Sequence, residues 1–150
     1  MMVKQRLTPG DVLELIKQGR RAYAQYLGRH PEYGDGILVS PVIHESRPEF
    51  GPELIRGGYV TFYPASAAVS RGFAEVIGTL PTTGLPTRFR RRGAIGTDGE
   101  VLTWIIEDGS YDTVRDSLAN DERKLPIAEI LNHEMLFHRV SHNWRPENEG

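Results

Sequence analysis

Apolar residues between positions 8 and 27 recur at the spacing of a helix. At about 100° per residue, the apolar positions share one arc, namely Val12, Leu15, Ile16, Gly19, Ala22, Tyr23, Tyr26 and Leu27. The polar positions share the opposite arc, namely Glu14, Lys17, Gln18, Arg21 and Gln25. Thr8 followed by Pro9 is a helix start signal, and Gly28 is an end signal. The pattern predicts a surface helix from Thr8 to about Leu27.

Two short runs with the composition of strands follow. "ILVSPVIH", residues 37–44, is rich in β-branched residues, and its Pro41 places it near a sheet edge or a bulge. "YVTFY", residues 59–63, alternates and predicts a second strand. The connection 45–58 contains two prolines and three glycines, and connections of this length are often functional. Helical spacing then predicts a second helix over 66–77, and we expect a mobile loop over 78–87.

The stretch "RFRRRGAIGTDGEVLTWIIED" predicts a hairpin around Asp98-Gly99, the preferred residues of a type I′ turn. Counting outward from that turn pairs Arg91 with Ile106 and Arg90 with Glu107. Alternation then puts Arg91 on the core side together with Phe89 and Trp104. Three arginines are expected on the solvent side, namely Arg88, Arg90 and Arg92.

The last third of the chain predicts a short helix over 112–118 and a final helix that begins at Pro126 and ends near Asn143. The element order is α-β-β-α-β-β-α-α. We therefore predict an α+β protein with a mainly antiparallel sheet of about four strands and helices on one face or end. We expect one globular domain over residues 1–150, with a disordered tail over 145–150.

Composition narrows the classes of function. The 150 residues are 39% hydrophobic and 25% charged, with a net charge of −2, so no global field favours nucleic acid or an anionic membrane. The absence of cysteine excludes disulfides, thiolate metal sites and cysteine nucleophiles. No apolar run approaches the roughly 18 residues that span a bilayer, and the N-terminal residues lack the apolar core of a signal peptide. We expect a cytoplasmic protein.

The stretch "NHEMLFHRVSH", residues 132–142, is the candidate metal site. Glu134, His138 and His142 are spaced i, i+4 and i+8, so they form one row, which the helical wheel turns inward between Ile130 and Met135. Two imidazoles and a carboxylate suit zinc or iron when a further ligand arrives, and His44 or Glu45 is the candidate. His133 and His138 diverge by roughly 140° and form no zincin pair. The favoured alternative is an ordinary helix end without metal.

Two further groups are candidate sites. Arg91 must reach an edge or a buried acid, which makes it a better binding candidate than its neighbours in "RFRRR". "VIHESRPEFGPE" presents His44, Glu45 and Arg47 after a strand end, where acid and base groups are often placed. A solvated charged loop is the favoured interpretation. The nucleophile elbow, the P-loop and the dinucleotide fingerprint are absent from the sequence, and we recognise no family in it.

Two classes of function remain. We favour a non-enzymatic cytosolic protein without cofactor that binds another protein as an adaptor, inhibitor or immunity-type protein; homo-oligomerisation is also compatible. Side chains of the types enriched at interfaces support it, namely Tyr33, Phe50, Tyr111, Trp144, Arg47 and Arg145. The alternative is a small metal-dependent hydrolase or oxygenase with zinc or iron on Glu134, His138 and His142.

Overall fold

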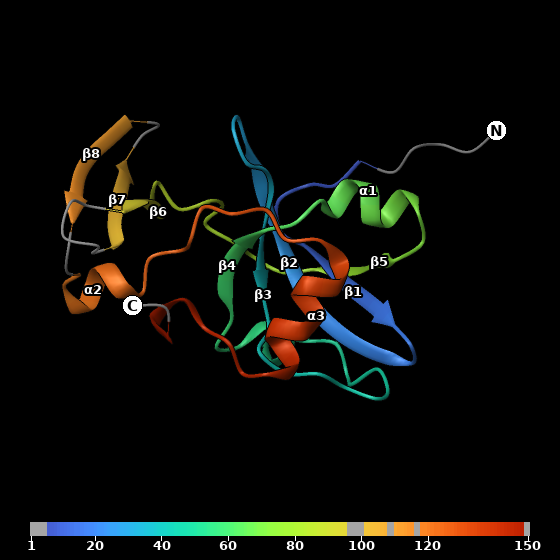
Figure 1. The fold of residues 1–150 in the computed structure, drawn as a ribbon. Coiled ribbons are helices and arrows are strands. Elements are labelled where there is room, and N and C mark those ends of the chain that lie inside the picture. Colours follow the sequence, from blue (N-terminus) through green and yellow to red (C-terminus); the bar gives the residue numbers. More distant parts are fainter. Residues whose placement is uncertain (1–5, 96–100, 108–109, 116–117, 149–150) are drawn as a thin grey trace.

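The computed structural model describes residues 6–95, 101–107, 110–115 and 118–148. Two antiparallel sheets and a few short helices make up this part of the chain, which confirms the α+β prediction (Figure 1). The first sheet has the strand order β4 (Tyr59–Phe62), β3 (Gly34–Val39), β2 (Arg20–His30), β1 (Asp11–Lys17) and β5 (Ala74–Thr79). The second has the order β6 (Arg88–Ile95), β7 (Val101–Glu107) and β8 (Ser110–Arg115).

The helical elements are short. They are α1 (Ala65–Ser70), α2 (Asn120–Arg123), α3 (His133–Ser141) and the 3-10 turns η1 (Pro52–Ile55) and η2 (Pro146–Asn148). The last of these lies within residues 145–150, where a disordered tail was expected; Pro146 is buried and the Arg145 guanidinium donates to the Gly57 carbonyl at 2.7 Å. No helix in the described ranges is long and apolar enough to cross a membrane.

The predicted N-terminal helix is wrong, because residues 8–27 contain the hairpin of β1 and β2. Gln18 and Gly19 form its turn with φ of 50° and 78°, and positive φ at both turn positions is the type I′ geometry that matches strand twist. Residues 12–15 and 22–27 are buried without interruption, which means that both faces of these strands are covered. Continuous burial hides the two-residue period, so the helical spacing in the sequence was a coincidence.

Some of the other predicted strands and helices agree with the structure, and others do not. The strand expected over 59–63 corresponds to β4, whereas the one expected over 37–44 overlaps β3 only at residues 37–39. The helix expected over 66–77 ends at Ser70, where Gly72 with φ of 79° turns the chain into β5. The helix expected over 112–118 is wrong, since β8 occupies most of it. The final helix begins at His133, because the Asn132 side chain caps it by accepting from the Met135 amide at 2.8 Å.

The hairpin of β6 and β7 is confirmed, but its register is not. Arg88, rather than Arg90, faces Glu107, and a bulge between Arg92 and Ile95 shifts the pairing. The tip, residues 96–100, lies outside the described residues. The predicted burial of the arginines is reversed: Arg91 is exposed, whereas Arg90 is buried and donates to the Pro146 carbonyl. The η2 turn that covers Arg90 comes from far along the chain, so local alternation could not reveal it.

An extended segment, residues 126–131, joins the two sheets. The Arg90 amide donates to the Pro126 carbonyl at 2.9 Å, and the Leu131 amide donates to the Phe62 carbonyl at 2.8 Å. The segment therefore covers the outer edges of both β6 and β4. A shared apolar cluster fills the space between the sheets, namely Phe62, Phe89, Ile106 and Ala128 with Tyr33, Val60 and Leu85 around them.

The five-stranded sheet is covered on both faces. One face carries Leu13, Leu15 and Ala24 and packs on α1 and α3 through residues such as Phe137. Figure 1 shows α3 crossing in front of this sheet. On the other face Val12 and Tyr23 pack against Leu54 of the connection between β3 and β4, and this connection carries the candidate site.

We predict that Phe62→Ala lowers the unfolding free energy by about 3–5 kcal/mol, because it empties the cluster that joins the sheets. Urea unfolding measures the effect. Phe73→Ala is the matched control; this side chain is 46% exposed and stacks against His133, so its loss should cost less than about 1.5 kcal/mol. Equal losses for the two variants would contradict the shared cluster.

Candidate functional site

Three neighbouring strands set a polar row on the face under the connection. Tyr23 of β2 and Glu75 of β5 both stand opposite Glu14 of β1. The Glu14 side chain is 2% exposed, so this carboxylate lies inside the protein next to a second one. Like charges directly opposite each other on a sheet destabilise it, and a buried charge must be paired. The row therefore requires a cation.

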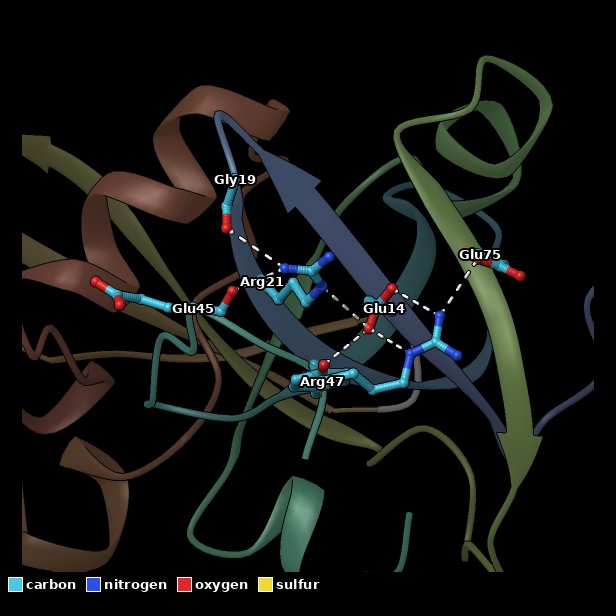
Figure 2. Close-up of polar contacts among 7 residues, drawn as sticks. Glu14, Gly19, Arg21, Glu45, Arg47 and Glu75 are labelled. Carbon is cyan, nitrogen blue, oxygen red and sulfur yellow. Dashed lines mark hydrogen bonds and ion pairs between the residues drawn. The ribbon is translucent and has the colours of Figure 1, made fainter. Parts of the chain in front are cut away.

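Arg47 supplies that cation from the connection, as Figure 2 shows. Its Nε donates to Glu14 Oε2 at 2.8 Å and its Nη2 donates to Glu14 Oε1 at 2.9 Å. The same Nη2 lies 3.5 Å from Glu75 Oε2, and the Tyr23 hydroxyl donates to Glu14 Oε2 at 2.8 Å. One guanidinium thus binds the buried carboxylate with two parallel hydrogen bonds and lies between the two opposed glutamates.

The surroundings fix the protonation states. The hydrogen bonds from Arg47 hold the pKa of Glu14 below its ordinary value of 4.5, although burial acts in the other direction. Burial, and then the bond to Glu14, raise the pKa of Tyr23 above its ordinary value of 10. At neutral pH the carboxylate stays ionised and the phenol stays protonated. Neither group is suited to exchange protons with a substrate. We therefore assign a structural role to Glu14, Tyr23, Arg47 and Glu75, and call these four residues the clamp.

The start of the connection is tied down beside this clamp. His44 and Arg21 exchange backbone hydrogen bonds of 2.9 and 2.7 Å, and the His44 ring packs edge-on against the Tyr23 ring at 5.4 Å. The Arg21 guanidinium donates to the Glu45 carbonyl at 2.9 Å and lies 3.6 Å from Glu14. His44, Glu45 and Arg47, which the sequence grouped as candidates, therefore do lie together. The Glu45 side chain is exposed and contributes through its backbone.

The connection has two further anchors beyond Arg47. The Phe50 ring lies on the bare backbone of Gly78, where an added Cβ would come within 2.4 Å of the ring. Leu54 is buried against Val12 and Tyr23. These anchors hold residues 44–54 against the sheet. The side of this segment that faces away from the sheet therefore stays in solvent. We call the exposed part of residues 42–50 the loop surface; Phe50 is 42% exposed and Val42 48% exposed.

The candidate metal row faces solvent, so its predicted inward orientation is wrong. Glu134, His138 and His142 are all exposed, since α3 buries Leu136, Phe137 and Val140 instead. Met135 and Ile130, the apolar residues that were expected to flank the row in the interior, are exposed as well.

The four candidate ligands do not come together. Glu134 pairs with Lys17 at 3.5 Å, while the His138 and His142 rings lie 4.1 Å apart on the surface. The fourth candidate, His44, packs against Tyr23 as described above. Among the residues that the structure describes, no three histidine, aspartate or glutamate side chains are placed to hold a metal together.

His133, which was not among the candidate metal ligands, has well-defined contacts at the start of α3. Its Nδ1 lies 2.6 Å from the Tyr63 hydroxyl, and its Nε2 lies 2.8 Å from the Ile16 carbonyl oxygen. The Phe73 ring stacks on it at 5.3 Å. This histidine ties the start of α3 to the end of β1, which is a structural task.

The remaining interface candidates are scattered. Arg91 is exposed on β6. Trp144 packs edge-on against Tyr59 at 5.4 Å, and the Arg139 guanidinium lies 4.1 Å from its ring. The Arg145 guanidinium lies 5.8 Å from the ring of the same Tyr59. Tyr33 is half-buried in the cluster between the sheets, and the Tyr111 side chain lies outside the described residues.

Sequence reasoning missed the centre of the site. It placed Glu14 on the solvent arc of a helix and gave no role to Glu75. The available signal was the pair Gln18-Gly19 between two apolar runs, which favours a two-residue hairpin and would have put Glu14 opposite Tyr23.

Comparison of the chain with family models, with curated proteins and with solved structures found no match, so the geometry alone supports the functional argument.

We predict that Glu14→Gln lowers the unfolding free energy by about 1–3 kcal/mol at pH 7, because the neutral amide cannot hold the guanidinium at both oxygens. A carboxylate with a lowered folded pKa stabilises the protein fully above its unfolded pKa and loses that effect as the pH falls through the folded pKa. The gap between wild type and variant should therefore shrink below about pH 4.5. Urea unfolding at pH 7 and pH 3 measures it.

The matched control is Glu75→Gln, which changes an exposed carboxylate 3.5 Å from the same guanidinium. We expect less than about 0.5 kcal/mol for it. Equal losses for the two variants, or a Glu14→Gln effect that does not depend on pH, would contradict the clamp.

Proposed function

We propose that the protein acts without catalysis, by binding another protein through the loop surface, in the manner of an adaptor, inhibitor or immunity-type protein. One observation carries the proposal: Val42 and Phe50 are 48% and 42% exposed on a connection that is held in place by the ion pair of Arg47 with the buried Glu14. An exposed apolar residue on a free loop needs no explanation. On this connection, anchoring by Arg47 holds both side chains at the surface, so a partner can bind them without first ordering the loop.

Anchoring favours binding because it lowers the entropy cost of association. A free loop loses conformational freedom when a partner orders it, and each immobilised side chain costs about 0.5–1.5 kcal/mol. Here Arg47, Phe50 and Leu54 already fix the backbone on the sheet. The partner would therefore meet a surface whose shape is set before contact.

Charge indicates the kind of partner. The Arg47 charge is compensated by Glu14, and Arg56 pairs with Glu53. Glu45 and Glu49, by contrast, are exposed within the loop surface, and Glu75 is exposed beside it. The loop surface thus presents exposed apolar and exposed acidic side chains, and the acidic ones complement a partner with a basic patch.

This proposal fits the site better than a metal-dependent enzyme does, because the expected ligands do not gather and the buried acid is locked in a structural pair. A chain without cysteine also suits a reducing compartment, and we propose a cytoplasmic location on that ground.

We predict that affinity capture from native lysate retains a protein on the wild type that the double variant Val42→Ser, Phe50→Ser does not retain. Removing both apolar side chains should weaken binding by at least tenfold, since about 1.4 kcal/mol is enough for that. An acidic surface also predicts that the partner is released as the salt concentration rises toward about 0.5 M. Circular dichroism would first establish that the variant is folded.

The matched control is Phe73→Ser, Met135→Ser, which changes two exposed apolar residues outside the loop surface and should leave the capture unchanged. A partner retained equally by both double variants would contradict the proposal. So would light scattering that shows a dimer of this chain dissolved by Val42→Ser, Phe50→Ser, because the loop surface would then serve self-association.

A further inference from the structure

A cleft lies at the tip of the β2–β3 hairpin, apart from the connection that forms the loop surface. Its volume is about 420 Å³, and its floor and walls include Asp35, Arg29, Tyr33, Ser66, Ser70 and Ile130. It brings together the hairpin, the start of α1 and the segment that joins the two sheets. Pockets of this size can hold a small group or one side chain of a partner.

The chemistry of the cleft centres on the Asp35 carboxylate, which is 6% exposed. Its Oδ2 accepts from the Ser66 amide at 2.9 Å. Its Oδ1 has weaker contacts, since the Tyr26 hydroxyl lies at 3.4 Å and the Arg29 Nη1 at 3.8 Å. A carboxylate has about four acceptor positions, so Oδ1 can accept a stronger, charged donor.

Arg29 marks the position of a cation without occupying it firmly. Its side chain is 74% exposed, and its distance to Oδ1 exceeds that of a hydrogen bond. An exposed ion pair of this kind contributes little to stability, because water and salt screen it. An incoming cation could displace the Arg29 guanidinium into solvent at small cost.

The walls of the cleft suit an aliphatic stem. Ile130 is 57% exposed at its rim, and Tyr33 lines it from the hairpin. Lysine and arginine carry a charged head on three or four methylene groups, which pack well on apolar surface while the head finds its partner.

We propose that this cleft receives a lysine or arginine side chain of a partner protein, with the charged head on Asp35 Oδ1 and the stem against Ile130 and Tyr33. The cleft shares no residue with the loop surface. It therefore does not depend on the proposed function, and either can fail without the other.

The experiment is an NMR titration of the full chain with acetyl-arginine amide and acetyl-lysine amide, followed at the backbone amides of Gly34, Asp35 and Ser66. We expect saturable shifts at these amides with both probes. Acetyl-citrulline amide has nearly the shape of the arginine probe but no charge, and it should cause no saturable shift. Equal binding of the citrulline probe, or no saturable binding of either charged probe, would overturn the proposal.

Two variants and a control distinguish binding in this cleft from nonspecific attraction of the charged probes to the protein. Ile130→Ser keeps Asp35 and its bond to Ser66 but removes the apolar rim, and it should raise the Kd of the charged probes by about threefold to tenfold. Asp35→Asn should abolish saturation. Met135→Ser, an exposed apolar change that does not line the cleft, should leave the Kd unchanged. An unchanged Kd in Ile130→Ser would overturn the role assigned to the cleft.

Discussion

The path of the chain depends on how the buried Glu14 carboxylate is held. Arg21 of the sheet lies 3.6 Å from it, whereas Arg47 of the connection donates a hydrogen bond to each of its oxygens. Strand pairing sets Glu14 opposite both Tyr23 and Glu75, so one neighbour donates a hydrogen bond and the other repels. A carboxylate at 2% exposure without a cation would cost several kcal/mol. Arg47 removes that cost, but only if the connection after β3 crosses this face of the sheet. The ion pair thereby fixes the course of a segment that has almost no secondary structure of its own.

The ion pair of Arg47 and Glu14 determines how the layers of the molecule are arranged and where the loop surface lies. The connection covers one face of the five-stranded sheet, while α1 and α3 cover the other. Since its inner side is occupied by Arg47 and Leu54, its outer side is available to a partner. The pair favours the arrangement in which Arg47 meets Glu14, because a buried carboxylate left without its partner is strongly destabilising. That suits a protein whose task is to present a surface of constant shape.

The sequence predicted what depends on local pattern. It located β4, the second half of β3 and the hairpin of β6 and β7, because β-branched residues and turn signals act over a few residues. It failed where distant segments decide the outcome. Burial on both faces made β1 and β2 resemble a helix, and the η2 turn buried Arg90 instead of Arg91. In the candidate site, the sequence singled out His44, Glu45 and Arg47 but not Glu14, because only the strand register shows that Glu14 lies beneath them.

If Arg47 holds the connection on the sheet, residues 45–50 are rigid, and backbone ¹⁵N order parameters report this rigidity. We expect values near 0.85 in the wild type, like those of the strands beneath, and values below about 0.6 in Arg47→Ala. Residues 20–26 of β2 provide the internal reference in both proteins. Order parameters below about 0.6 for residues 45–50 in the wild type, or no change in Arg47→Ala, would show that the ion pair does not hold the connection.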